Sequence, residues 1–544
     1  MWHQNYTAVG GNLWLSTAVA ALPILLLFYL IGVRRLAAWK SALVALATAF
    51  VIACFAFGTP VTVAIAAALY GAAFGLFPIC WIVLAGIFLY RLTVESGQFE
   101  VIKDSIAHLT DDKRLHVLLI AFAFGAFVEG AAGFGAPVAI AGAMLAGVGV
   151  SAFEAAALCL LANTAPVAFG SIGIPIITLA GLTGLPLDQV SASVGRISPI
   201  LSLIIPLYLM VVFAGWRKAR GVLPAIAAVS IAFAGTQFVV ANFHGPYLTD
   251  ILASLAAVIA CVVLLQFWKP ADDYFHEDAT PAQHRAHSTG AVLKAWMPYL
   301  LLVVFVLLWG FDPIRVRLET VTLRLDVPFL HNHVMRMPPA MKEITATPAV
   351  FKFDWLAAAG TGCMFAAILG GLAIGMRPRQ MARVFAATMR QLALPVLTIA
   401  SVLGFAFLMN YSGMTVTLGL AFAATGWFFP FFSAFLGWLG VFVTGSDTSA
   451  NALFGNLQVV TAQKLGLNPL LTAATNSAAG VMGKMISLQS IAVAVAATGM
   501  PQSDESKLFR WTLKHSLLLT ALIGLIAMVF AHLTPWVIPA ISGK

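Results

Sequence analysis

Two acidic residues of this 544-residue chain lie inside apolar segments, where an ionisable side chain is costly to bury. Glu129 belongs to GAFVEGAAGFGAP, residues 125–137, and Asp447 belongs to TGSDTSAN, residues 444–451. A carboxyl group that has been removed from water can take up and release a proton during a transport or reaction cycle. We therefore predict that Glu129 and Asp447 couple the function of this protein to protons.

Polar side chains suited to binding an anion recur downstream of both acids. Asn-Thr in LANTAP and Asn-Ser in ATNSAA lie among small residues, and we expect each pair at a helix break, where amides, hydroxyls and backbone N–H groups converge. Lys484 can supply a full positive charge, unless its side chain extends to the membrane interface. The predicted substrate-binding residues are Gly130, Asn163, Thr164, Ser446, Thr448, Asn476, Ser477, Lys484 and Gln489. No metal or cofactor is expected.

The two acidic motifs indicate an internal duplication. GAFVEG at 125–130 and GVFVTG at 440–445 share the pattern G-x-F-V-x-G, and an asparagine follows the last glycine after 33 residues in the first case and 31 in the second. The acids stand at different positions of the motif, so they are not duplicates of each other. Interrupted apolar segments at matching places in two halves are typical of secondary transporters built from structural repeats.

The composition places these motifs in a membrane protein. Hydrophobic residues make up 61% of the chain and charged residues only 9%, against about 25% charged in an ordinary soluble domain. We predict an all-α polytopic membrane protein with about 12–14 transmembrane helices and two repeats that contain broken or re-entrant helices. Plain spans are expected near residues 11–33, 41–57, 61–90, 152–180, 192–215, 221–242, 249–268, 294–311, 355–375, 391–410, 412–430 and 515–540.

Basic residues predict the orientation of the chain. Arg34, Arg35 and Lys40 lie between the first two expected spans, and further lysines and arginines follow the third and fifth spans, so these loops are expected in the cytoplasm and the N-terminus outside. The net charge of +9 is spread over loops without a recognition motif, which argues against a nucleic-acid partner. The expected partners are a small-molecule substrate, protons and the lipid bilayer, and the oligomeric state is left open.

The expected organisation has two halves. Residues 1–268 form the first half with a broken segment at 115–180, and residues 294–544 form the second half with a broken segment at 431–500. A polar cytoplasmic linker at 269–293 joins them, and residues 312–353 form an extramembrane loop, called the cap below.

Two other classes of function fit parts of the pattern. The same glycines could line a permanent anion channel, which sequence does not distinguish from alternating access. An intramembrane hydrolase could be imagined from Ser446, Asp447 and His515, but no base lies near the serine and no Gly-x-Ser-x-Gly motif is present. We therefore predict a transporter and not an enzyme.

Long stretches of this chain resemble the L-lactate permease family of bacteria. The resemblance is carried by GAFVEGAAGFGAPVAIAGAML, NTAPVAFGSIGIPI, FLGWLGVFVTGSDTSANALFGNLQ and FRWTLKHS, and it extends over nearly the whole chain. It implies uptake of L-lactate, and of D-lactate and glycolate, with protons across the bacterial inner membrane. It also implies that Asn163-Thr164 and Asn476-Ser477 correspond to the substrate motifs of the wider ion-transporter superfamily. The family often has proline where this chain has Leu488.

Overall fold

The computed structural model describes residues 1–133, 135–271, 287–339 and 343–541. Most of the expected linker therefore lies outside the described residues. The helices of the first half are α1 (Leu13–Phe28), α2 (Ala38–Phe55), α3 (Val61–Phe74), α4 (Cys80–Glu95), α5 (Gln98–Ala107), α6 (Lys113–His116), α7 (Gly125–Ala131), α8 (Ala136–Gly147), α9 (Ala152–Ala162), α10 (Gly170–Thr183), α11 (Leu187–Ala219), α12 (Leu223–Phe243) and α13 (Thr249–Phe267).

The second half is also mainly helical and contains most of the short strands. Its helices are α14 (Thr289–Gly310), α15 (Asp312–Glu319), α16 (Ala359–Ala373), α17 (Pro378–Tyr411), α18 (Met414–Phe422), α19 (Phe429–Thr444), α20 (Asp447–Leu465), α21 (Pro469–Lys484), α22 (Leu488–Thr498) and α23 (Glu505–His532). The strands of the chain are β1 (Trp2–His3), β2 (Leu323–Asp326), β3 (Val334–Arg336), β4 (Thr345–Ala346) and β5 (Val350–Phe353).

The apolar helices are long enough for a multi-pass membrane protein, as predicted. Among the described residues, ten spans pass by length and composition, or twelve if two bent pairs each count as one. The pairs are α9 with the turn and helix at 167–183, bent by 63°, and α21 with α22, bent by 41°. The predicted number of 12–14 therefore meets this range only at its upper end. Consecutive helices that follow each other closely, such as α11 and α12, are counted together as one span.

Glycines interrupt the chain at both acidic motifs. α7 ends at Ala131, and Gly133 and Gly135 adopt φ angles of +57° and +84° before α8 begins. α19 ends in the same way at Gly445, whose φ is +72°. These left-handed conformations are accessible to glycine at little cost, so a helix break at each motif follows from local sequence.

The break expected at the second Asn-Ser pair is not found there. Asn163 caps the C-terminal end of α9, as expected, but Asn476 and Ser477 lie within the continuous helix α21. This helix runs on to Lys484, and the chain breaks only at 485–487. The prediction was wrong because residues 470–484 contain no proline, and their two glycines only weaken a helix that is buried over its whole length.

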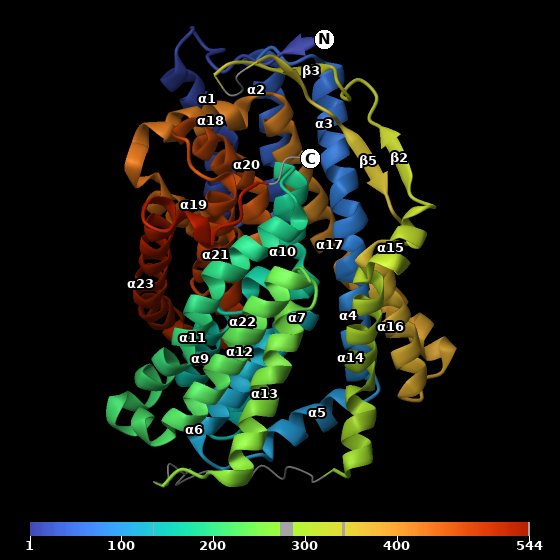
Figure 1. Cartoon of the computed structure of the whole chain (residues 1–544), viewed down its shortest axis with the longest axis vertical. Coiled ribbons are helices and arrows are strands. Elements are labelled where there is room, and N and C mark those ends of the chain that lie inside the picture. Colours follow the sequence, from blue (N-terminus) through green and yellow to red (C-terminus); the bar gives the residue numbers. More distant parts are fainter. Residues whose placement is uncertain (134, 272–286, 340–342, 542–544) are drawn as a thin grey trace.

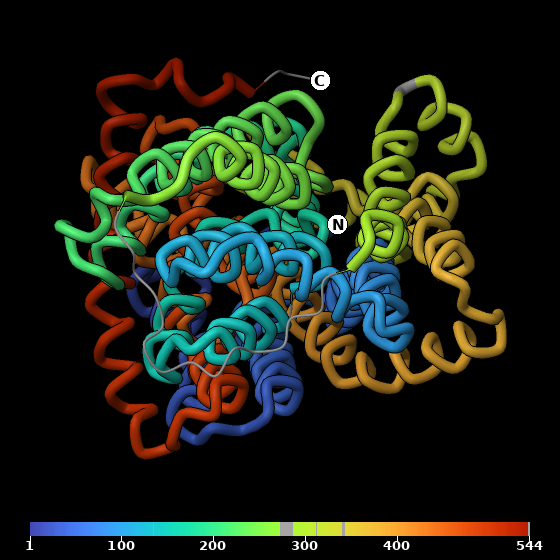
Figure 2. The backbone as a smooth tube through the Cα atoms, turned by 90° about the horizontal axis from the view of Figure 1, so that it is seen from below, coloured from blue at the N-terminus to red at the C-terminus, as the bar shows by residue number. Residues whose placement is uncertain are grey.

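The cap and the N-terminus lie together at one end of the molecule (Figure 1). β1 pairs in parallel with β3, β3 pairs with β4, and β2 and β5 form an antiparallel ribbon. The C-terminal end of α13 and the N-terminal end of α14 lie at the opposite end (Figure 1). Seen from below, α14 and α16 pack beside α4 to one side of the other helices (Figure 2).

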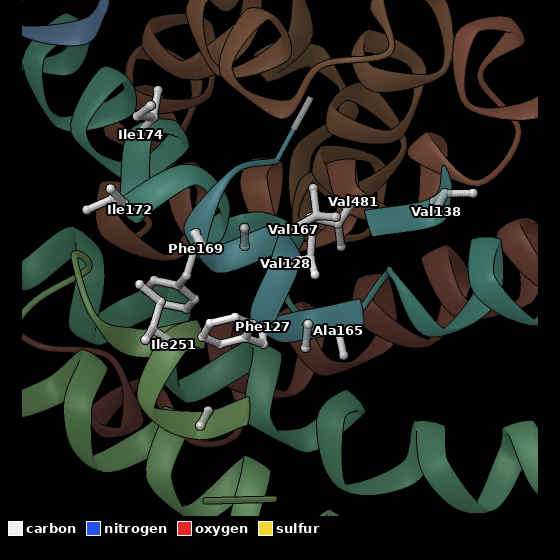
Figure 3. Packing of buried hydrophobic residues seen from close by; sticks show 14 of the residues in the cluster. Phe127, Val128, Val138, Ala165, Val167, Phe169, Ile172, Ile174, Ile251 and Val481 are labelled. Atoms are coloured by element: carbon white, nitrogen blue, oxygen red, sulfur yellow. The ribbon is translucent and has the colours of Figure 1, made fainter. Parts of the chain in front are cut away.

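The centre of the protein is a continuous apolar cluster around the first acidic motif. The span formed by α6, the π-helical segment Val117–Phe124 and α7 is fully buried. Phe127 on α7, Phe169 in the turn before α10 and Ile251 on α13 belong to this cluster (Figure 3). Glu129 is therefore held on a helix whose residues are all buried.

Candidate functional site

A cavity of about 310 Å³ opens where the broken helices meet. Its polar lining comes from both halves of the chain, and apolar side chains of α2, α10, α17 and α22 complete the wall. The polar residues that line it are Glu129, Ser171, Thr398, Thr444, Ser446, Asp447, Thr448, Ser449, Lys484, Gln489 and Ser490.

Helix N-termini surround this cavity. Residues of the first turns of α20 and α22 line it, and so do Gly135 just before α8 and Ile174, where α10 becomes regular after Gly173. Ser446 and Ser487 cap α20 and α22 by accepting hydrogen bonds from backbone N–H groups. The partial positive charge of several helix ends converges on one space, which suits an anion.

Glu129 and Lys484 form a buried ion pair in the cavity wall. Nζ of Lys484 lies 2.8 Å from Oε1 of Glu129, and the two side chains are 10% and 4% exposed. Nδ2 of Asn163 donates to the other oxygen of Glu129 at 2.9 Å. Lys484 thus does not extend to an interface. The pair joins residues that are 355 positions apart and links the two halves across the site.

Asp447 is held differently. Its Oδ2 accepts a hydrogen bond from the hydroxyl of Ser477 at 2.6 Å and another from Nδ2 of Asn451 at 3.3 Å. Its Oδ1 has no hydrogen-bond partner within the described part of the chain. Asn476 supports this arrangement from behind, because its Nδ2 donates to Oδ1 of Asn451 at 2.9 Å. Oδ1 of Asp447 is therefore an unused acceptor, and it is buried against Gly480 on α21.

Glycines allow the backbone to approach both acids closely. A Cβ atom at residue 170 would lie 2.6 Å from Oε1 of Glu129, and one at residue 480 would lie 2.6 Å from Oδ1 of Asp447. Both distances are shorter than a side chain tolerates. The glycines thus shape the pockets that hold the carboxyl groups, in addition to breaking helices.

The predicted residues separate into two groups. Six of them line the cavity, namely Glu129, Ser446, Asp447, Thr448, Lys484 and Gln489. Five do not line it, namely Gly130, Asn163, Thr164, Asn476 and Ser477. Most of the second group lie behind the lining residues and position them by hydrogen bonds. Asn163 donates to Glu129, Ser477 donates to Asp447, and Asn476 donates to Asn451. The hydroxyl of Thr164 donates to the carbonyl of Leu161 and to neither acid in the described part of the chain.

Six polar residues near the site were not among the predicted site residues, namely Ser171, Asp250, Thr398, Thr444, Ser449 and Ser490. Ser171 and Ser490 line the cavity, and each could have been found from its position at the start of a helix that follows a break. Asp250 is buried at the start of α13 and packs against Gly130. It resembles an ordinary acidic residue in a first helical turn, so local sequence gave no sign of its position.

The imagined hydrolase triad does not assemble. Ser446 Oγ caps α20 by accepting from the N–H of Ser449. His515 instead contacts the hydroxyl of Tyr208 at 2.5 Å and packs on the ring of Trp511.

A bundle of apolar helices with a central polar cavity at their breaks defines a multi-pass membrane protein of the transporter class. The family model for L-lactate permease matches residues 16–534, so the chain belongs to the L-lactate permease family. It is 44% identical over 551 residues to L-lactate permease of Escherichia coli (strain K12), covering 99% of this chain and 100% of the relative.

Another relative and a solved structure extend this comparison. Glycolate permease GlcA of Escherichia coli (strain K12) is 44% identical over 554 residues, which cover 98% of each chain. The solved structure of the YdaH transporter of Alcanivorax borkumensis matches 85% of this chain and 86% of its own, with 15% sequence identity and a TM-score of 0.46.

Proposed function

We propose that this protein is a secondary active transporter that takes up L-lactate together with protons, and that D-lactate and glycolate are further substrates. The proposal is supported by the names of the L-lactate and glycolate permeases to which the chain is similar over nearly its full length. Lactate and glycolate share a carboxylate with a hydroxyl group on the next carbon, so the proposed substrate class is 2-hydroxymonocarboxylates.

The observation that carries the proposal is the convergence of a lysine and helix N-termini on one cavity. The substrate carboxylate lies against the first turns of α20 and α22, where Ser446, Thr448 and Gln489 line the wall. Backbone N–H groups and Lys484 supply the positive field that a desolvated carboxylate requires.

Glu129 links substrate binding to the proton. When the substrate carboxylate attracts Nζ of Lys484, Glu129 loses the ion partner that lies 2.8 Å away. An unpaired carboxylate in this buried position is costly, so Glu129 takes up a proton at that moment. Of the two predicted proton carriers, we therefore assign the proton to Glu129.

Asp447 serves the hydroxyl group of the substrate. Its Oδ2 is occupied by Ser477 and Asn451, whereas its Oδ1 has no partner among the described residues. A hydroxyl on the second carbon can donate to this oxygen when the carboxyl group of Asp447 turns from Gly480 toward the cavity. Such a bond discriminates a 2-hydroxy acid from the same acid without the hydroxyl, which would leave a buried acceptor unpaired.

We further propose that the chain lies in the bacterial inner membrane, with the N-terminus and cap outside and the linker at 269–293 in the cytoplasm. The basic loops support this orientation. The division into two repeat halves, residues 1–268 and 294–544, also remains our proposal, and the helix breaks in both halves support it.

Purified protein in proteoliposomes should accumulate labelled L-lactate above its external concentration when the outside is made acidic, because each lactate enters with a proton. Collapse of the pH gradient with a protonophore should abolish the accumulation. Liposomes without protein serve as the control. Uptake that does not respond to the pH gradient would contradict proton coupling, and uptake that never exceeds equilibrium would favour the anion channel.

Gly480→Ala should reduce L-lactate uptake about tenfold, since a misplaced methyl group in a packed interior costs about 1–3 kcal/mol. Its Cβ would lie 2.6 Å from Oδ1 of Asp447 and would displace the carboxyl group. Initial uptake rates measure the effect. Gly235→Ala is the matched control, because residue 235 is exposed within α12 and has open space around it. Equal rates in the two variants would contradict the assigned position of Asp447.

A further inference from the structure

A third acid lies buried near the cavity. Asp250, in the first turn of α13, is 1% exposed, and neither of its carboxyl oxygens has a hydrogen-bond partner in the described ranges. Glu129 and Asp447, by contrast, are bonded by Asn163, Lys484 and Ser477. An acid that is buried without any partner is accommodated at least cost in its neutral, protonated form. Structural packing alone gives no reason to keep it.

Asp250 lies directly against the helix turn that carries Glu129. A Cβ atom at Gly130 would be 2.9 Å from the Cβ of Asp250, so only glycine at 130 lets α13 pack this closely. The charged groups that act on Asp250 are Glu129 on α7 and Lys484 on α21. α10 and the segment Val117–Phe124, which also pack against α13, contain no titratable side chain.

The neutral polar neighbour on α12 is Gln237, whose amide lies close to Asp250 but cannot take up or release a proton. Gln237 donates to the carbonyl of Ala165 at 3.2 Å and accepts from the hydroxyl of Ser202 at 2.7 Å. Among the groups that act on Asp250, the Glu129–Lys484 pair is therefore the one with which it can exchange a proton.

A second cavity, of about 880 Å³, begins at the turn just before Asp250. It is lined by residues 241–248, by Phe311 next to the cap and by Arg315 in the cap. Pro246 in this lining packs its carbonyl against Gly173, in the irregular start of α10, and Ser171 two residues earlier lines the first cavity. The start of α10 therefore separates the two cavities.

Asp250 bridges the same two spaces. It lies three residues after Tyr247, which lines the second cavity. It also packs against Gly130, and the preceding residue, Glu129, lines the first cavity. We propose that Asp250 is the proton relay that passes a proton from the cap-side cavity to Glu129.

This inference rests on the proposed proton-coupled uptake. When Lys484 leaves Glu129 for the substrate, the O–H bond of the Asp250 carboxyl breaks and an O–H bond forms on the Glu129 carboxylate. Asp250 then regains a proton from water through the second cavity. No charge is created or lost inside the protein other than that of the entering proton.

The test compares two assays on Asp250→Asn in proteoliposomes. Asparagine has the same shape but cannot donate a carboxyl proton. Uptake of labelled L-lactate driven by an inward pH gradient should fall at least about tenfold, since general proton transfer by a positioned group contributes about 10²–10⁴-fold. Exchange of labelled for unlabelled lactate at equal pH on both sides needs no net proton movement, so it should stay within about threefold of wild type.

Ser254→Ala is the matched control, because Ser254 is buried one turn further along α13 and its hydroxyl donates to the carbonyl of Ile251 in the same helix. It should leave both assays unchanged. Asp250→Glu keeps a titratable group and should retain more gradient-driven uptake than Asp250→Asn.

Each other outcome decides against the relay. Gradient-driven uptake at wild-type level in Asp250→Asn would overturn it, as would an equal loss in both assays. Failure of Asp250→Asn to fold would also overturn it, since a neutral acid should accept a neutral amide of the same shape. If uptake by the wild-type protein does not respond to the pH gradient, proton coupling itself is refuted. If uptake by both the wild type and Asp250→Asn responds to the gradient, only the relay is refuted.

Discussion

Lys484→Met is expected to lower L-lactate uptake about 100-fold or more, because truncating one partner of a buried charge pair costs about 2–5 kcal/mol. The substitution removes the cation from the cavity and leaves Glu129 buried with only Asn163 as a partner. It should also destabilise the protein by about 3–5 kcal/mol through the unpaired carboxylate. Initial uptake rates and thermal unfolding in detergent measure the two effects.

A double variant separates the two contributions of Lys484. Glu129→Gln combined with Lys484→Met removes both charges, so it should recover much of the lost thermal stability but no uptake. Lys464→Met is the control, since Lys464 is exposed in the last turn of α20. Wild-type uptake by Lys484→Met would exclude the lysine from substrate binding. Recovery of uptake in the double variant would assign Lys484 a purely structural role.

Asp447→Asn is expected to remove the preference for 2-hydroxy acids. Ser477 and Asn451 both donate to Oδ2 of Asp447. In the variant, the side-chain oxygen of the asparagine must therefore occupy the position of Oδ2, and its NH₂ group occupies the position of Oδ1. The substrate hydroxyl then meets a donor in place of an acceptor. A hydrogen bond to a charged group contributes about 1.5–3 kcal/mol, so the preference for lactate over propionate should fall roughly 10- to 150-fold.

Competition against labelled L-lactate measures this change, with lactate, glycolate, pyruvate, acetate and propionate as competitors. Glycolate should lose its advantage over acetate in the same variant. Asp326→Asn is the control, because Asp326 is an exposed acid in strand β2 of the cap. An Asp447→Asn protein that still prefers lactate over propionate would show that another group binds the hydroxyl.

Local properties of the chain were sufficient to predict the class of protein and the places where its helices break. Composition alone required a membrane bundle, because so apolar a chain with so few charges must satisfy its backbone inside helices. The breaks at Gly133 and Gly445 follow from the conformational freedom of glycine, which depends on the residue itself and not on distant neighbours. The family could also be identified from long motifs.

The partners of the acids could not be predicted in this way. Glu129 binds Lys484 across 355 positions, and the packing of α13 on α7 brings Asp250 beside them. Asn476 shows the limit of local reasoning. Its neighbouring sequence predicted a helix break, but this segment stays helical because α21 is buried over its whole length.

The sequence by itself thus determined that this is a polytopic membrane protein of the L-lactate permease family with broken helices and buried acids. Only the tertiary structure decided which acid pairs with the lysine, which keeps an unused oxygen and which lies alone between two cavities. The physical reason is that backbone breaks depend on a few adjacent residues, whereas burial and ion pairing depend on packing between helices that are far apart in the chain.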